Sequence, residues 1–346
     1  MLNRCNGSTH LELSAPAAAM TSDDQPEKIR VGDLYWKQIG SNGWVLGKVS
    51  AYDADTTTAT FDLVDEDSGD VLQPVQQDLI NVTMTPIFPS NPLFSTCADM
   101  TSLHHLHEAA LAKNLQDRSV LSNQRPYTFM ANVLIAINPL RYLEEPDKDG
   151  YIGQSLDKCP PHPYHVAESA YRQLATVRPV MQNQSIIISG ESGSGKTETS
   201  KIILDFLTVR AMSHRQSVDD SGNEPEVTRV SVRHAPRVLS SFSSRDAPSS
   251  VVGWSSVTLG DRLMETIPIL ESFGNAKTHR NHNSSRFGKY MRLQFSSRHH
   301  HLTGASIDTY LLEKSRLVHP PMGERNFHIF YELLRSGRVD LLDPLH

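Results

Sequence analysis

The sequence predicts an α/β fold in which a mixed, mainly parallel-cored sheet is flanked by helices. Three adjacent segments carry this prediction. Residues 184–189 include three consecutive isoleucines, Ile186 to Ile188, and such a β-branched run is typical of a buried strand. Residues 190–197 match the pattern G-x-x-x-x-G-K-[ST]. From Thr197 to Leu207, apolar residues recur with the spacing of a helix that buries one face.

The glycine-rich loop supplies the groups that bind nucleotide phosphates. Glycines let successive backbone N–H groups turn toward an anion, and the N-terminus of the following helix adds a favourable dipole. We expect Lys196 to reach the β- and γ-phosphates and the Thr197 hydroxyl to ligate Mg²⁺. The predicted phosphate-binding residues are Gly190, Glu191, Ser192, Gly193, Ser194, Gly195, Lys196 and Thr197. This strand–loop–helix context favours a P-loop NTPase over the alternative, a purely structural glycine turn.

The N-terminal part differs in character. Residues 1–27 are expected to form a disordered leader, because Glu12 interrupts the apolar core that a signal peptide needs. Residues 28–80 predict a small β unit, with short strands at 31–36, 43–49 and 58–64 separated by turn residues. Trp36 and Trp44 could form a ligand-binding pair or belong to a core. We favour the core.

Residues 212–260 predict a flexible surface insertion. This stretch is rich in Ser, Arg, Asp and Pro, contains few large apolar residues and shows no sustained period.

Composition excludes several classes of protein. A net charge of −6 over 346 residues does not indicate the excess of positive charge that binding to nucleic acid or an anionic membrane requires. The widely spaced Cys5, Cys97 and Cys159 suggest neither a disulfide framework nor a zinc site, which fits a reducing, cytosolic compartment. No apolar run approaches the roughly 18–20 residues of a membrane span.

A second polar segment identifies the class of NTPase. Residues 279–290 cluster Asn, Ser and Arg on a glycine-flanked loop, and these side chains supply the amide, hydroxyl and guanidinium groups of a nucleotide switch. The segment closely resembles switch I of the myosin motor head. The loop at 190–198 likewise resembles the myosin P-loop, with Ser194 where that family usually has Ala. Kinesins are the nearest rival, but their switch continues with Ser-His, whereas this one continues with Phe287, Gly288 and Lys289.

The resemblance covers most of the chain, and residues 95–346 are expected to form a partial myosin motor domain. The unit at 28–80 resembles the SH3-like barrel found at the N-terminus of many myosin heads. The matching segments of the motor are an opening helical segment at 99–118, a strand pair at 127–139, a helix at 160–171, a transducer strand and its continuation at 304–316, and a segment at 323–331.

Site roles follow from this resemblance. It implies ATP and Mg²⁺ as cofactors, with Thr197 and Ser285 as the metal ligands. Lys196, Ser284 and Arg286 would be the catalytic residues, Ser284 placing the attacking water and Arg286 pairing with a glutamate of a second switch. Asn281 would contact the phosphates, and Asn138 and Pro139 would contact the purine.

The second switch, Asp-x-x-Gly-Phe-Glu, does not occur after Tyr290. We therefore expect the N-terminal part of an actin-based myosin motor, of an unconventional class that the sequence does not determine, truncated before the second switch. Its myosin ATPase activity, a phosphoanhydride hydrolysis, would be incomplete in this chain alone. Actin filaments would bind mostly through regions outside it, and light chains or calmodulin only downstream. The expected location is the cytoplasm, on the cytoskeleton.

Two alternatives stay open. One is a short nucleotide-binding or interaction module without turnover. The other is an unrelated P-loop kinase or GTPase, which conflicts with the residues of switch I.

Overall fold

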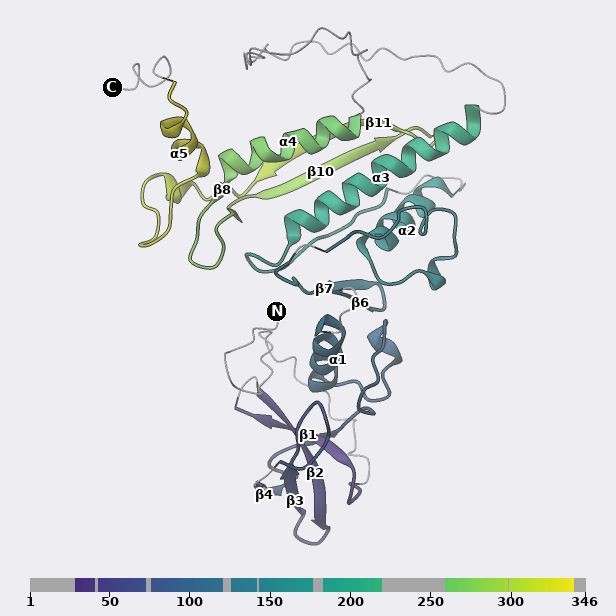
Figure 1. The fold of residues 1–346 in the computed structure, drawn as a ribbon, viewed down its shortest axis with the longest axis vertical. Helices are drawn as coiled ribbons and strands as arrows, with labels where there is room; N and C mark the ends of the chain where they lie inside the picture. Colours follow the sequence, from purple (N-terminus) through teal and green to yellow (C-terminus); the bar gives the residue numbers. More distant parts are fainter. Residues whose placement is uncertain are drawn as a thin grey trace. The chain divides into compact units, whose positions relative to one another are not determined.

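The structure is a computed structural model. It describes residues 29–40, 43–72, 76–120, 126–141, 143–176, 183–219, 259–297 and 299–338. The predicted leader at 1–27 and most of the predicted insertion at 212–260 lie outside these residues. The chain divides into two compact units, Met1–Ala170 with Ser185–Ser200 and Tyr171–Gln184 with Lys201–His346. Figure 1 labels most of their helices and strands.

The first unit opens with a five-stranded antiparallel sheet in the order β4-β3-β2-β1-β5. Its strands are β1 (Leu34–Ile39), β2 (Gly43–Asp53), β3 (Thr58–Leu63), β4 (Gln77–Asn81) and β5 (Ile87–Pro89). The strands predicted at 31–36, 43–49 and 58–64 overlap β1, β2 and β3. The predicted boundary at residue 80 is too early, because β5 lies beyond it and pairs with β1 through Trp36 and Phe88.

One face of this sheet packs against helix α1 (Glu108–Val120). Small side chains on the helix let it approach the large aromatic residues of the strands. The buried cluster consists of Trp36, Trp44, Leu46, Val64, Ala109 and Ala112. Trp36 is 1% exposed and Trp44 is 4% exposed, so both tryptophans belong to the core. The interpretation of the two residues as an exposed ligand-binding pair is excluded.

The opposite face of the sheet has a second apolar cluster, in which the ring of Phe61 covers Gly47. A Cβ atom at Gly47 would lie 2.1 Å from Cε1 of Phe61, far inside van der Waals contact. Glycine at this position of β2 therefore lets the aromatic ring pack directly on the backbone.

A short hairpin follows α1 in the chain. Strand β6 (Tyr127–Met130) pairs with β7 (Val133–Ala136) in antiparallel register. Arg118 at the end of α1 donates from Nε to Oγ1 of Thr128 (2.8 Å) and from Nη2 to the carbonyl of Tyr127 (3.0 Å). This guanidinium is buried, so the two bonds fix the hairpin to the helix. Helix α2 (Pro163–Ala175) comes next in the chain.

The prediction of a buried strand at 184–189 is wrong, because these residues form no regular secondary structure. Side-chain exposure alternates along the segment, Ile187 is 89% exposed, and no described strand pairs with it. The predicted parallel core is likewise not seen: the described ladders are antiparallel, and parallel pairing is limited to one isolated bridge between Asp99 and Phe129. A parallel ladder needs neighbouring strands that run in the same direction, and the described residues place none beside 184–189.

Helix α3 (Lys196–Asp219) starts at the glycine-rich loop. Its buried side chains Ile203, Phe206 and Leu207 are the apolar residues from which the helix was predicted. The helix continues through Asp219, so residues 212–219 of the predicted insertion are helical. A sequence without apolar periodicity can extend a helix that is already nucleated, because propagation costs less than nucleation.

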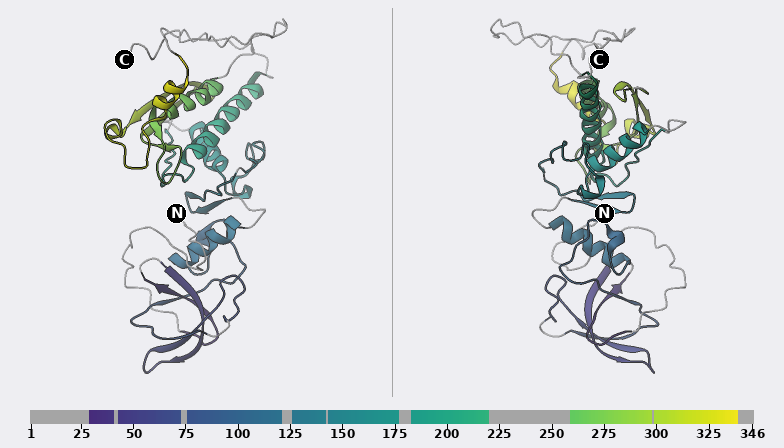
Figure 2. Two further views of the ribbon diagram at one scale, coloured as in Figure 1. Left: turned by 60° about the vertical axis from the view of Figure 1, so that its left-hand side comes forward. Right: turned by 90° about the vertical axis from the view of Figure 1, so that its right-hand side faces the viewer.

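The second unit is built on helix α4 and a long hairpin (Figures 1 and 2). Gly260 lies so close to α3 that a Cβ atom would be 2.7 Å from the side chain of Thr208. The remaining elements are α4 (Leu259–Gly274), β8 (Asn275–Ala276), β9 (Ser284–Ser285), β10 (Gly288–Phe295), β11 (Leu302–Tyr310), the short 3-10 helix η3 (Lys314–Leu317) and α5 (His328–Arg335). Strands β10 and β11 pair in antiparallel register from Gly288–Tyr310 to Phe295–Leu302.

Within the described ranges, no helix combines the length and the apolar character that a bilayer crossing requires.

The packing of Phe61 on Gly47 gives a first testable prediction. We expect Gly47→Ala to lower the free energy of unfolding by about 1–3 kcal/mol, because the added methyl group overpacks the core. Ser50→Ala, at an exposed position of the same strand, is the matched control and should change it by less than about 0.5 kcal/mol. Urea denaturation followed by tryptophan fluorescence measures both. Equal effects of the two substitutions would contradict the packing.

Candidate functional site

The predicted phosphate loop has the backbone conformation that such a loop needs. Gly190, Gly193 and Gly195 have φ values of 154°, 84° and 93°, a region that side chains other than glycine rarely adopt. At Gly190 space is also limiting, because a Cβ atom would lie 2.6 Å from Oγ of Ser194. The turn is closed by the N–H of Ser194, which donates to the carbonyl of Glu191 (3.2 Å). Helix α3 then starts at Lys196.

Lys196 is bound to its own loop. Its Nζ atom donates to the carbonyls of Gly190 and Glu191, both at 2.8 Å. Burial lowers the pKa of this ammonium group, because removal from water disfavours the charged form. The ammonium group therefore lies over the loop with oxygen partners, in the place from which it could bind a phosphate oxygen.

Thr197 occupies the first turn of α3, and its carbonyl accepts a hydrogen bond from Oγ of Ser200 (2.7 Å). Among the described residues, nothing is hydrogen-bonded to the Thr197 hydroxyl. It is therefore available as an oxygen ligand for a hard cation such as Mg²⁺.

The predicted purine-contact residues lie beside the phosphate loop. The β6–β7 hairpin leads into them, and the side-chain amide of Asn138 donates to the carbonyl of Gly193 (2.7 Å). Its Oδ1 atom accepts from the N–H of Leu140 (2.9 Å). Pro139 lines a shallow pocket with Ser119, Ile137, Asn138 and Arg141. Asn138 thus supports the loop directly, a contact that sequence reasoning did not predict.

The predicted switch I segment belongs to the second unit, where it forms a tightly bonded turn. Asn281 accepts from the N–H of Asn283 through Oδ1 (2.9 Å), and the carbonyl of Asn281 accepts from the N–H of Thr278 (2.9 Å). Strand β9 then pairs with β8, so that Ser284 faces Ala276 and Ser285 faces Asn275. The asparagines of the motif therefore shape the turn itself.

The two serines of the motif differ in burial. Ser284 is 1% exposed, and its Oγ atom accepts from Nη1 of Arg286 (3.1 Å). Ser285 is exposed, and its hydroxyl has no hydrogen-bond partner within the described parts of the chain. Ser285 can therefore reach a ligand as the structure stands, whereas Ser284 is turned inward.

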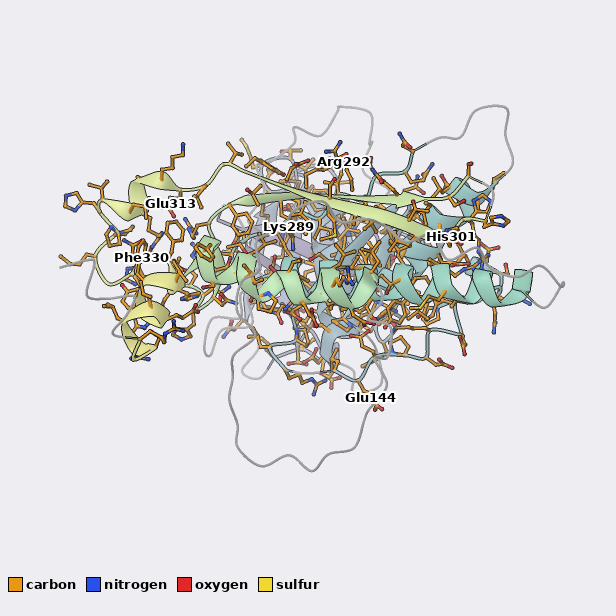
Figure 3. All side chains as sticks on the ribbon, turned by 90° about the horizontal axis from the view of Figure 1, so that it is seen from above. Glu144, Lys289, Arg292, His301, Glu313 and Phe330 are labelled. Carbon is orange, nitrogen blue, oxygen red and sulfur yellow. The ribbon has the colours of Figure 1, made fainter. Side chains whose placement is uncertain are left out.

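Arg286 has a partner that the sequence did not reveal. Its Nε atom donates to Oε2 of Glu313 (2.7 Å), and Figure 3 labels Glu313 in the segment that follows β11. In this structure the partner of Arg286 is therefore Glu313, and the pairing with a glutamate of a second switch stays a prediction. Glu313 and Arg286 are too far apart in sequence for any local pattern to signal their pairing.

Glu313 also binds Arg316, which is 1% exposed and central to a larger network. Arg316 donates from Nε to Oε2 of Glu313 (2.7 Å), from Nη2 to Oε2 of Glu324 (2.6 Å) and from Nη1 to the carbonyl of Arg325 (2.8 Å). Partial burial raises the pKa of Glu313, but the hydrogen bonds from Arg286 and Arg316 outweigh it and hold the pKa below 4.5. The hydrogen bond from Arg316 likewise lowers the pKa of Glu324.

This network predicts sensitivity to acid. Because the folded-state pKa values of both glutamates lie below their ordinary value, the stabilisation is full above that ordinary pKa and is lost as the pH falls through the folded pKa. We expect Glu313→Gln to lower the free energy of unfolding at pH 7 by about 1–2 kcal/mol, a modest effect because solvent partly screens this ion pair. The variant should also lose less stability than the unchanged chain when the pH is lowered.

Glu265→Gln is the control, because Glu265 is exposed on α4 and has no hydrogen-bond or ion-pair partner in the described chain. Urea denaturation at pH 7 and pH 4 measures both variants. If Glu313→Gln behaved like Glu265→Gln, the carboxylate would not be holding this part of the unit together.

Comparisons with known proteins find relatives whose similarity covers both the phosphate loop and the switch I segment. The family described as "Myosin head (motor domain)" matches residues 97–346. The Myosin-J heavy chain of Dictyostelium discoideum is 34% identical over 343 residues, which cover 97% of this chain and 14% of that protein. The Myosin-H heavy chain of the same organism is 39% identical over 241 residues, 69% of this chain and 12% of that protein.

Unconventional myosin-Ic of Gallus gallus is 40% identical over 241 residues, 69% of this chain and 19% of its own length. The chain thus spans less than a fifth of each of these three relatives. The family match includes both the phosphate loop and the switch segment. On these grounds the chain belongs to the myosin head (motor domain) family.

Proposed function

We propose that this chain is the nucleotide-binding part of an actin-based motor ATPase, which binds ATP through residues 190–197. One observation carries the proposal. Three glycines in left-handed conformation lead directly into α3, whose first turn presents Lys196 and Thr197. Backbone N–H groups, a helix N-terminus and an ammonium group then converge on one place, which is the arrangement that binds a polyphosphate.

Each of these residues has a defined task in the proposal. Lys196 exchanges its bonds to the carbonyls of Gly190 and Glu191 for bonds to phosphate oxygens. Thr197 and Ser285 provide hydroxyl oxygens to Mg²⁺, in keeping with their lack of other partners in the described residues. When bound, Mg²⁺ neutralises phosphate charge and aligns the groups for phosphoryl transfer. The remaining loop residues, Glu191, Ser192, Gly193, Ser194 and Gly195, offer backbone donors.

The switch segment supplies the catalytic side chains in the proposal. Asn281 contacts the phosphates after releasing its bonds within the turn, and Ser284, which is buried in this structure, orients the attacking water once the segment turns it toward the ligand. Arg286 fixes the position of Ser284, since its guanidinium is bonded both to that hydroxyl and to Glu313. Positioning and charge stabilisation are the main requirements of phosphoryl transfer to water, and in the proposal these groups supply part of both. Asn138 and Pro139 are the proposed purine contacts.

The wider assignment follows the family. We infer that the five-stranded sheet is an SH3-like barrel attached to the motor, and that the whole protein binds actin filaments and associates with the cytoskeleton. Light-chain or calmodulin binding would belong to segments after this chain.

The ammonium group of Lys196 gives the direct test of nucleotide binding. We expect Lys196→Ala to weaken the binding of Mg-ATP by at least about tenfold, because it removes a charge-assisted hydrogen bond to phosphate. Titration of the full chain with a fluorescent ATP analogue measures the affinity. Lys158→Ala is the control, since Lys158 is an exposed lysine of the same unit. Tight binding by the Lys196 variant, or no binding by the unchanged chain, would refute the proposal.

The metal ligands are tested separately. Addition of Mg²⁺ should strengthen ATP binding by the unchanged chain, and Thr197→Ala combined with Ser285→Ala should remove this gain while leaving binding in EDTA unaltered. Ser200→Ala is the matched control, because this hydroxyl of the same helix is already bonded to the carbonyl of Thr197. A double variant that keeps the full response to Mg²⁺ would show that other groups ligate the metal.

A further inference from the structure

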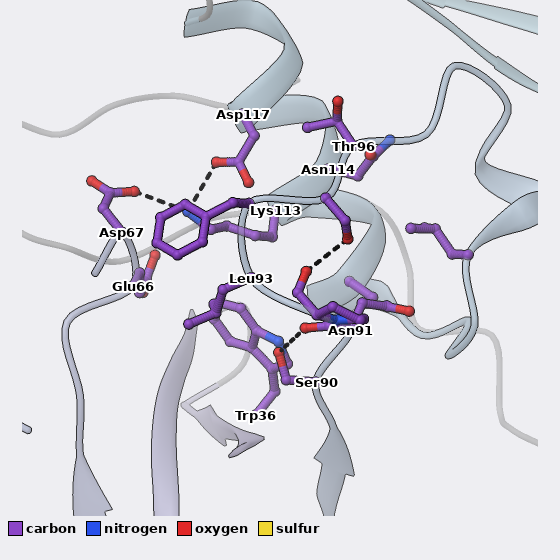
Figure 4. A pocket seen from close by; sticks show the side chains of 15 residues that line it. Trp36, Glu66, Asp67, Ser90, Asn91, Leu93, Thr96, Lys113, Asn114 and Asp117 are labelled. Atoms are coloured by element: carbon purple, nitrogen blue, oxygen red, sulfur yellow. Dashed lines mark hydrogen bonds and ion pairs between the residues drawn. The ribbon is translucent and has the colours of Figure 1, made fainter. Parts of the chain in front are cut away.

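The first unit contains a cavity that the nucleotide site does not use (Figure 4). It has a volume of about 310 Å³, which lies at the lower end of the range for small-molecule sites. Part of its wall is apolar and comes from Trp36, Leu93, Phe94, Leu103 and Ala110. The charged residues that line it are Glu66, Asp67, Lys113 and Asp117.

The one lysine of this lining is already neutralised. Nζ of Lys113 lies 2.9 Å from Oδ1 of Asp67 and 2.9 Å from Oδ1 of Asp117. The two asparagines of the lining, Asn91 and Asn114, are hydrogen-bonded to the backbone of His105 and Cys97. These polar groups are therefore committed to holding the walls of the cavity in place.

Glu66 is the exception. Its carboxylate accepts no hydrogen bond from any described residue, and Figure 4 draws none to it. Burial raises the pKa of Glu66 to about 7. The positive charge of Lys113 opposes this rise in pKa. The negative charges of Asp67, Asp65 and Asp117 add to it, because they disfavour a further negative charge on Glu66. Among the described residues, the cation that acts on Glu66 is thus Lys113, which already forms ion pairs with Asp67 and Asp117.

An aromatic ring completes the lining. Phe94 is 80% exposed and has a φ of 64°, a left-handed conformation that costs conformational energy in a residue with a side chain. Ser95 holds this turn, donating from Oγ to the carbonyl of Pro92 (2.7 Å). An exposed aromatic face near a carboxylate is an environment that attracts an organic cation.

We propose that this cavity binds a small organic cation, namely an ammonium group on an aromatic or aliphatic body, with the charge on Glu66 and the body against Leu93 and Phe94. The ligand keeps its charge at neutral pH, as alkylamines do. Glu66 must be ionised to bind it. Affinity therefore rises as the pH rises through about 7, and binding below that pH releases a proton from Glu66.

Calorimetric titration of the full chain with phenethylammonium tests this site. Binding should be about tenfold tighter at pH 8 than at pH 6, which is the change in the ionised fraction of a carboxyl group with a pKa near 7. The neutral 2-phenylethanol and the anionic phenylacetate should bind at least about tenfold more weakly at pH 8.

Variants separate charge from shape. Glu66→Gln should weaken phenethylammonium binding by about tenfold and remove its pH dependence. Glu108→Gln, which makes the same charge change at an exposed position of α1 outside the cavity, should leave both unaltered. Phe94→Ala, at an exposed side chain, should weaken binding by about threefold. Absence of binding at pH 8, equal binding of 2-phenylethanol, or an unaltered Glu66→Gln variant would each overturn the proposal.

Discussion

The second unit depends on a buried positive charge that has to be satisfied. Arg316 is almost completely removed from water, and an unpaired guanidinium in such a place would be strongly destabilising. Its partners come from three positions, Glu313, Glu324 and the carbonyl of Arg325. Satisfying one charge therefore fixes the segment after β11, the turn at 324–325 and, through the second use of Glu313, the switch residue Arg286.

This arrangement joins stability to the proposed chemistry. Arg286 donates to Glu313 and to Ser284, so the place of a proposed catalytic hydroxyl is set by a carboxylate that lies outside the motif. Buried ion pairs are weak evidence for stability, but their directional bonds fix geometry well. In the phosphate loop, too, hydrogen bonds hold a charged side chain in one position. Its lysine is held by two carbonyls, so less side-chain entropy remains to be lost when a phosphate is bound.

The sequence predicted local features well and distant pairings poorly. The loop at 190–197 and the start of α3 depend on backbone conformations and periodicities within a few residues, which are visible in a single chain. Burial of Trp36 and Trp44 follows from their place in short strands. The Arg286–Glu313 pair joins residues on either side of a hairpin, and no local pattern reports it. Strand β5 was missed because Ile87–Pro89 is short and ends in a proline. The prediction of a strand at 184–189 was wrong, since a β-branched run shows propensity for a strand but does not show which strands would pair with it.

The hydrogen bond from Asn138 to the carbonyl of Gly193 has a consequence for how this site can vary in evolution. The same side chain lies at the proposed purine contact and supports the loop that is proposed to hold the phosphates. On the proposed function, a substitution there would alter base selectivity and phosphate affinity together, because one amide group would serve both. Natural selection would then act on the two properties as a single trait at this position, and nucleotide preference would diverge at neighbouring residues that leave the phosphate loop untouched.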